Sequence, residues 1–219
     1  MKVSILCTDP AHPVNGYLQE WIAVNSADHQ ISLVRNRAHL PGGNILFLIS
    51  CSEIIRKQDR AKYDSSLVLH ASDLPEGRGW SPHIWAITNG AESVTLSLLE
   101  AEDKVDSGRI WKKMILAIPR HALWHEINES LFNAEIDLMD YALQHFDSVA
   151  PLDQASAGDE TKLRMRTPDD SRLDPSLTLE EQFDLIRVCD PARFPAFFEL
   201  RGHRYKLTLE KLNADSNFN

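Results

Sequence analysis

The apolar run NILFLI at residues 44–49 is the feature that most constrains the fold of this chain. It follows the turn residues Pro41, Gly42 and Gly43, and Ser50 comes directly after it. A short run that does not alternate polar and apolar residues is typical of a parallel strand buried on both faces. Such a strand needs a covering layer on each side. The run therefore predicts a sheet with helices on both faces.

The rest of the first 150 residues alternates between strand and helix patterns. Strands are predicted over residues 2–7, 31–34, 66–70, 93–100 and 109–117, and helices over residues 15–24, 80–89 and 120–146. Ser52 is predicted to cap a further helix that begins near Glu53. The expected fold class is α/β, with a Rossmann-type, mostly parallel sheet flanked by helices.

The organisation changes after this first domain, which we place at residues 1–150. Residues 151–161 contain Pro, Ser, Gly and acidic residues and are predicted to be a linker. Residues 162–219 are predicted to form a small C-terminal region for substrate binding or oligomer contacts. It would contain a helix over 179–188 and strands over 196–200 and 204–209, and the sequence Arg-Gly-His between the two strands predicts a β-hairpin.

Composition and charge exclude several classes of function. The net charge of −9 argues against a nucleic-acid partner, which would require many cationic contacts to phosphate. No apolar run is long enough to cross a membrane, so no membrane contact and a cytoplasmic location are expected. Cys7, Cys51 and Cys189 are far apart and lack metal-ligand spacing, so neither a disulfide framework nor a metal site is expected.

Two ionisable residues stand at positions where α/β proteins place catalysts. His70 ends a predicted strand and opens a Gly-containing loop, and ligands of open α/β sheets bind beyond the carboxyl ends of strands. Asp106 precedes Ser107-Gly108 in a predicted turn between strands. Each residue alone is more often structural than catalytic. The segment that joins them makes both of them candidates.

That segment resembles the formyltransferase family. LHASDLPEGRG at residues 69–79 resembles the family's histidine loop, in which His is followed by Ser, Leu-Pro and Arg-Gly. VDSG at residues 105–108 resembles its aspartate turn, and RTPDDS at 166–171 with Asp174 is similar to the segment after the family's linker. The resemblance covers nearly the whole chain. GRGWSP at residues 77–82 is most similar to small nucleotide-sugar N-formyltransferases of the pseudaminic-acid type.

The resemblance implies transfer of a formyl group from 10-formyltetrahydrofolate to the amine of a nucleotide-linked sugar in glycan biosynthesis. It implies UDP-4-amino-4,6-dideoxy-N-acetyl-altrosamine as the acceptor, a formyltransferase-like fold, and no metal. His70 would stabilise the oxyanion of the tetrahedral intermediate, and Asp106 would accept the amine proton. The folate would contact Ser52, Ile54, Ile55, Ala101, Glu102, Asp103 and Val105.

The acceptor is expected to lie toward the later part of the chain, and a homodimer is compatible with this arrangement. Aromatic rings can stack on a uracil base, and arginine suits bidentate contacts to phosphate. The residues proposed to bind the acceptor are Arg78, Trp80, Phe183, Arg187, Phe197 and Tyr205.

Position 68 departs from the family pattern. The family usually has Asn two residues before the His, where its amide polarises the formyl oxygen, and this chain has Val68. Loss of one oxyanion donor typically lowers the rate on the order of a hundredfold or more. Either another donor compensates, with a protonated His70 as the nearest candidate, or the chain is a degenerate, non-catalytic binder of folate or nucleotide sugar.

Other acceptors stay open as alternatives. A formyltetrahydrofolate hydrolase would use similar His and Asp residues with water as the acceptor. The methionyl-tRNA branch normally has a larger C-terminal barrel and a more basic surface, so the short and acidic chain argues against that branch. No Gly-rich loop of the dinucleotide or Walker type is present, which argues against NAD and ATP.

Overall fold

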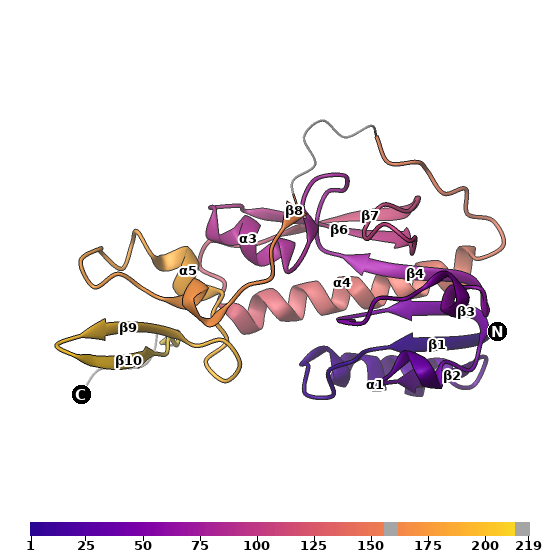
Figure 1. Cartoon of the computed structure of the whole chain (residues 1–219), viewed down its shortest axis with the longest axis horizontal. Coiled ribbons are helices and arrows are strands. Elements are labelled where there is room, and N and C mark those ends of the chain that lie inside the picture. Colours follow the sequence, from indigo (N-terminus) through magenta and orange to yellow (C-terminus); the bar gives the residue numbers. More distant parts are fainter. Residues whose placement is uncertain (156–161, 213–219) are drawn as a thin grey trace.

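The centre of the protein is one twisted, mostly parallel sheet, seen in a computed structural model that describes residues 1–155 and 162–212 (Figure 1). Its six strands follow the order β2-β1-β3-β4-β6-β7. They are β2 (Gln30–Val34), β1 (Lys2–Leu6), β3 (Gly43–Leu48), β4 (Tyr63–His70), β6 (Ser93–Glu100) and β7 (Ile110–Ala117). Strands β1 to β4 pair in parallel, and β6 pairs antiparallel with both of its neighbours. The predicted α/β class is confirmed.

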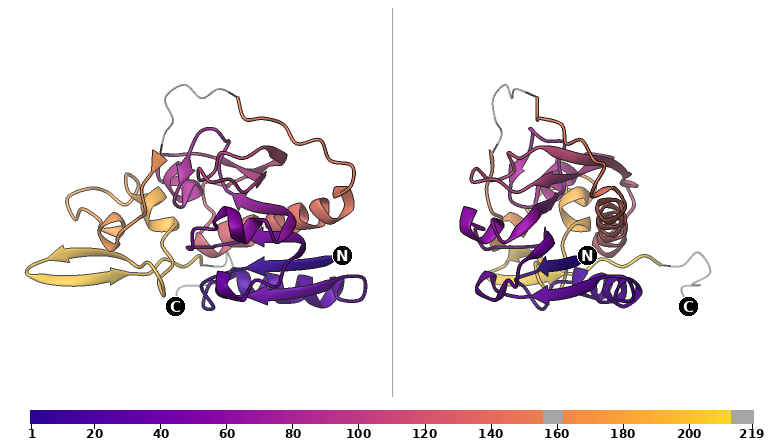
Figure 2. Two further views of the ribbon diagram at one scale, coloured as in Figure 1. Left: turned by 45° about the vertical axis from the view of Figure 1, so that its right-hand side comes forward. Right: turned by 90° about the vertical axis from the view of Figure 1, so that its right-hand side faces the viewer.

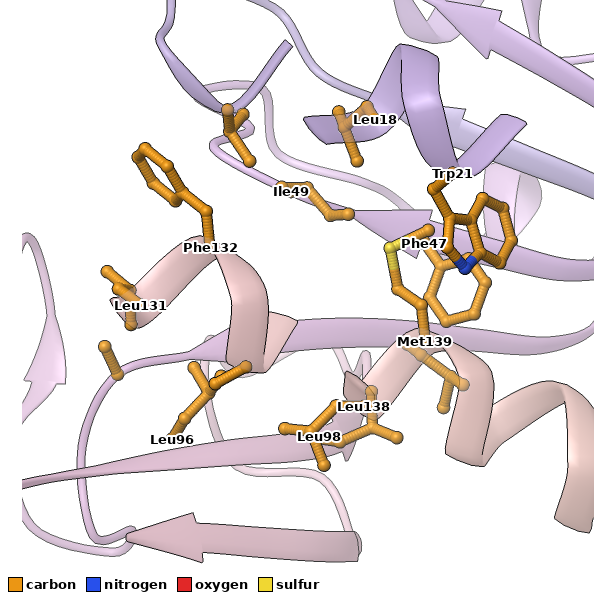
Figure 3. Close-up of a cluster of buried hydrophobic side chains, with 14 of the residues drawn as sticks. Leu18, Trp21, Phe47, Ile49, Leu96, Leu98, Leu131, Phe132, Leu138 and Met139 are labelled. Atoms are coloured by element: carbon orange, nitrogen blue, oxygen red, sulfur yellow. The ribbon is translucent and has the colours of Figure 1, made fainter. Parts of the chain in front are cut away.

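The larger helices pack on one face of this sheet. They are α1 (Val14–Asn25), α3 (Pro82–Thr88) and α4 (Trp124–His145), and each contributes to one buried apolar cluster. Figure 3 shows Trp21 of α1 and Met139 of α4 meeting beside Phe47 of β3, and the Trp21 and Phe47 rings are 6.2 Å apart in an edge-to-face arrangement. Close packing of side chains from these three elements holds the helices and the sheet in fixed positions relative to one another.

The opposite face of the sheet is covered by shorter elements. Its cluster contains Leu6, Leu46 and Leu48 of the central strands. The cover consists of the 3₁₀ helix η1 (Arg37–His39) with the loop after β3, and the four-residue α2 (Lys57–Arg60) packs against β4. The predicted helices on both faces are present, and those on this face are short.

Several predicted helix bounds are wrong because hydrogen bonds in the neighbouring turns determine where the helices begin. No helix begins near Glu53. Ser52 instead hydrogen bonds Thr8, with Oγ to Oγ1 3.0 Å apart, and α2 begins only at Lys57. Helix α4 begins four residues later than predicted. Its first turn is closed by Glu126, whose carboxylate accepts the backbone N–H of Leu123 at 2.8 Å.

The C-terminal region packs beside α3 and ends in a projecting hairpin (Figures 1 and 2). Its elements are β8 (Lys162–Leu163), η2 (Pro168–Ser171), α5 (Phe183–Arg187), β9 (Ala196–Leu200) and β10 (His203–Leu207). The predicted hairpin is confirmed, with a two-residue turn in which Arg201 has φ 51° and Gly202 has φ 79°. The predicted helix over 179–188 is shorter than expected, because its first residues form turns.

The segment predicted to be a linker is partly attached to the sheet. Leu152 forms a two-way backbone bridge to Ile110, with N···O distances of 2.7 and 2.9 Å. Residues 156–161 lie outside the described residues. Within the described ranges, no helix is long and apolar enough to cross a membrane.

Candidate active site

The structure brings His70 and Asp106 together in one buried pair. His70 is the last residue of β4, and Asp106 lies in the loop between β6 and β7. Nδ1 of His70 is 3.6 Å from Oδ1 of Asp106, and both side chains are buried. The distance is within ion-pair range but longer than a hydrogen bond, so direct proton transfer would require the two groups to move closer. The predicted spatial pairing is confirmed, whereas the catalytic roles stay predictions.

Hydrogen bonds fix the orientation of both members of the pair. Nε2 of His70 is 2.9 Å from the carbonyl oxygen of Gly77, which can only accept, so Nε2 carries a proton and Nδ1 faces Asp106. Oδ2 of Asp106 accepts the backbone N–H of Gly79 at 2.9 Å, which leaves Oδ1 directed at His70. Residues 77–79, which include the two-residue strand β5 (Arg78–Gly79), thus hold both side chains at once.

The backbone around the pair is unusual in the way that functional sites often are. Asp106 has φ 55°, in the left-handed region that costs a non-glycine residue energy and that Asp tolerates better than most. Gly79 has φ 109°, and a Cβ on it would lie 2.2 Å from the carbonyl oxygen of Leu163 in β8. Position 79 must therefore be glycine, because the backbone of Leu163 lies too close to it to admit a side chain.

Gln154 is a site residue that the sequence did not reveal. Its side-chain NH₂ donates to the carbonyl oxygens of Asp106 at 2.9 Å and Gly108 at 2.8 Å, and its Oε1 accepts from Arg78 at 2.7 Å. Arg78 also donates from Nε to the Asp106 carbonyl at 3.1 Å. A glutamine in a stretch that reads as a linker has no distinguishing pattern, so no sequence signal pointed to it.

Arg78 and Arg187 were both predicted to bind the acceptor, but both side chains are buried and form hydrogen bonds within the protein. Arg78 supports the Asp106 turn. Arg187 has a side chain that is 1% exposed, and it contacts Asp184 at 2.6 Å and the carbonyl oxygens of Pro119 and Ala122. These partners indicate that Arg187 joins α5 to the start of α4, which corrects the expectation that it would meet a phosphate.

The other predicted acceptor residues are divided between the surface and the interior. Trp80 and Tyr205 are exposed, and the Tyr205 ring stacks on Phe198 of the hairpin. Phe197 is buried beneath the guanidinium of Arg204, and Phe183 is half-buried at the start of α5. Trp80 directly follows Gly79, whose N–H binds Asp106, whereas Phe197 and Tyr205 lie on the two strands of the hairpin.

The residues predicted to contact folate lie mostly on the thinly covered face of the sheet. Ile55 and Ala101 join the cluster of that face together with Val68, so position 68 offers only an apolar side chain there. The side chains of Ile54 and Val105 are 73% and 58% exposed. Next to Ala101, Glu102 and Asp103 approach Arg60 at 4.0 and 2.6 Å.

Neither a metal ion nor a cysteine nucleophile is supported by the arrangement of side chains. Among residues 1–155 and 162–212, no group of three His, Cys, Asp or Glu side chains is placed to hold a metal ion. Cys51 lies near the expected folate groove, but burial raises the pKa of its thiol to about 11, which disfavours the reactive thiolate. Cys7 and Cys189 are buried and form no disulfide.

Comparison with known proteins identifies the fold. The solved structure of methionyl-tRNA formyltransferase from Clostridium thermocellum matches with a TM-score of 0.81 at 22% identity, over 98% of this chain and 95% of that one. A sugar N-formyltransferase from Shewanella matches with a TM-score of 0.73 at 17% identity, over 97% and 99% of the two chains. HypX from Aquifex aeolicus, in complex with tetrahydrofolic acid, matches with a TM-score of 0.75 at 17% identity, over 93% of this chain and 36% of HypX. The protein therefore has the formyltransferase fold.

At the level of sequence the relationships are more distant. No protein-family profile matches the chain. Methionyl-tRNA formyltransferase from Rickettsia bellii is 26% identical over 117 residues, which are 52% of this chain and 38% of the length of that relative. The chain and the Clostridium enzyme cover each other almost completely, so a short chain does not by itself argue against the methionyl-tRNA branch.

Proposed function

We propose that this protein transfers a formyl group from 10-formyltetrahydrofolate to an amine. The observation that carries the proposal is the buried His70–Asp106 pair, 3.6 Å apart, at the end of β4 and in the β6–β7 loop of a formyltransferase fold. The amine nitrogen bonds to the formyl carbon to give a tetrahedral oxyanion, and the bond from that carbon to N10 of the folate then breaks. The amine loses one proton and N10 gains one, so the two products are the formamide and tetrahydrofolate.

The pair suits the proton movements of this reaction. Asp106 directs Oδ1 into the space shared with His70, where it can accept the proton that the amine releases. A protonated His70 would donate from Nδ1 to the oxyanion while Nε2 stays bound to Gly77. This second role would replace the donor that Val68 cannot supply.

The folate is proposed to bind on the thinly covered face of the sheet. The exposed aliphatic side chains of Ile54 and Val105 lie on the two loops expected to flank the pterin, and an aromatic ring over them would bury apolar surface. The tetrahydrofolate complex of HypX, which has the same fold, supports this choice of co-substrate.

For the acceptor we propose the amino group of a nucleotide-linked 4-amino-4,6-dideoxy sugar, with UDP as the nucleotide. The sequence resemblance around residues 77–82 and the net charge of −9 support a sugar over a transfer RNA.

The test is release of tetrahydrofolate from 10-formyltetrahydrofolate in the presence of separate acceptors. UDP- and dTDP-linked 4-amino sugars, methionyl-tRNA, and buffer alone should be compared, and mass spectrometry should identify the formylated product. We expect acceptor-dependent release with a UDP-amino sugar. Equal release in buffer alone would indicate a hydrolase, formylation of methionyl-tRNA alone would indicate the other branch, and no release would indicate a non-catalytic binder.

Replacement of Gln154 by Ala is expected to lower kcat about tenfold and to change the Michaelis constants of both substrates little. The Asp106 turn would lose the NH₂ group that spans two of its carbonyls, so the carboxylate would be held less firmly. Gln154→Glu should show a similar loss, because its carboxylate accepts from Arg78 but cannot donate to either carbonyl. The exposed Gln19→Ala variant is the matched control. A normal kcat in Gln154→Glu would show that the NH₂ contacts do not matter.

A further inference from the structure

His83 lies at the start of α3, close in the chain to the segment that holds Asp106. It is the second residue of α3, which begins shortly after Gly79, the residue whose N–H binds Asp106. His70, His12 and Arg166 interact electrostatically with the His83 ring. These residues belong to the end of β4, the loop after β1 and the segment before η2.

The ring of His83 carries a polar atom without a partner. Nδ1 is buried and has no hydrogen-bond partner among the described residues. A buried polar atom left unpaired typically costs about 1–3 kcal/mol, and such atoms are rare enough in proteins to require an explanation. A ligand that supplies the missing hydrogen bond is one explanation, because the free protein then bears a cost that binding removes.

The surroundings of His83 keep its ring neutral. Burial lowers the pKa of His83 to about 4, and the charges of His70, His12 and Arg166 act in the same direction. The cation of Arg166 is also held in place, with its guanidinium 5.8 Å from the centre of the Trp85 ring. A neutral imidazole has one donor and one acceptor nitrogen, so it can bind a hydroxyl, an amide or an amine without adding charge.

We propose that His83 binds the acceptor substrate through Nδ1, by a hydrogen bond to a polar group adjacent to the amine that is formylated. This inference rests on the proposed formyl transfer and names one residue that would contact the acceptor. The favoured acceptors are those with a hydroxyl or amide group next to the amine, as amino sugars have. His83 would select and orient the acceptor without taking part in proton transfer.

Two variants of His83 separate ligand binding from a structural role. His83→Met places an apolar side chain of similar size in the site, and His83→Asn keeps a polar atom near the position of Nδ1. The exposed His121→Met is the matched control. Thermal unfolding of the free proteins should be compared with kcat and with the Michaelis constants for a UDP-4-amino sugar and for the folate co-substrate.

We expect His83→Met to unfold a few degrees higher than wild type and to have a Michaelis constant for the acceptor raised about tenfold or more, as the loss of one hydrogen bond allows. The constant for the folate should not change, and His83→Asn should recover part of the acceptor affinity. A lower unfolding temperature, or an unchanged Michaelis constant for the acceptor, in His83→Met would overturn the inference.

Failure of the proposed function would look different. In that case the wild type would transfer no formyl group to any acceptor, and calorimetric titration of the UDP-amino sugar would replace the kinetic measurement. Raised stability with weakened binding in His83→Met would still support a ligand-binding His83. A fall in the unfolding temperature of the free variant would overturn it whether or not the protein is a transferase.

Discussion

Replacement of His70 or Asp106 by Asn is expected to lower kcat for formyl transfer on the order of a hundredfold or more. Neither amide can accept the proton that leaves the amine, and Asn at position 70 cannot become a cationic donor to the oxyanion. Both roles stabilise the transition state more than the bound substrates. The loss should therefore be found in kcat, with the affinity for the UDP-amino sugar nearly unchanged by calorimetry.

The controls for this prediction follow from the hydrogen bonds of the pair. Asp106→Asn keeps a side-chain oxygen that can accept the N–H of Gly79, and His70→Gln can still donate to the carbonyl oxygen of Gly77. Unfolding temperatures near that of wild type would show that the loss is chemical. If either Asn variant kept near wild-type turnover, that residue would have no catalytic role.

Replacement of Glu135 by Met is expected to raise the free energy of unfolding at pH 7 by about 2–3 kcal/mol, and the unfolding temperature by roughly 5–10 °C. Glu135 lies within α4, and its Oε2 is buried without a hydrogen-bond partner among the described residues. Burial raises its pKa to about 8. At neutral pH the folded protein must therefore bury either a protonated carboxyl or an unpaired charge.

The pH dependence gives the sign of this effect. Between the ordinary pKa of Glu and about 8, the folded state binds a proton that the unfolded state has released, so stability falls as pH rises through this window. The advantage of Glu135→Met should be small at pH 5 and should grow up to about pH 8. Urea unfolding at the two pH values measures it, with the exposed Glu129→Met as control. A gain that is equal at both pH values would contradict the raised pKa.

Residues close together in the sequence were enough to predict most of the sheet and the hairpin. Strand β6 has the predicted bounds, Ser93–Glu100, although burial alternates only in its first half and residues 96–99 are buried on both faces. The Arg201-Gly202 turn is also local, since its positive φ angles depend on the residues of the turn itself. The resemblance of the two motifs to the formyltransferase family identified His70 and Asp106 as candidate catalytic residues from the sequence alone.

Only the tertiary structure decided which buried polar groups have a hydrogen-bond partner and which have none. The sequence predicted that Arg187 contacts a phosphate, but its guanidinium donates to carbonyl oxygens of the turn before α4. Gln154 was predicted to lie in a linker, but its side chain donates to the carbonyl oxygen of Gly108. The unpaired atoms of His83 and Glu135 have no local signature. Local periodicity reports which face of an element is buried, whereas hydrogen-bond partners come from segments tens of residues away. For this protein the sequence alone determined the layers and the candidate pair, and long-range packing decided the geometry of the site.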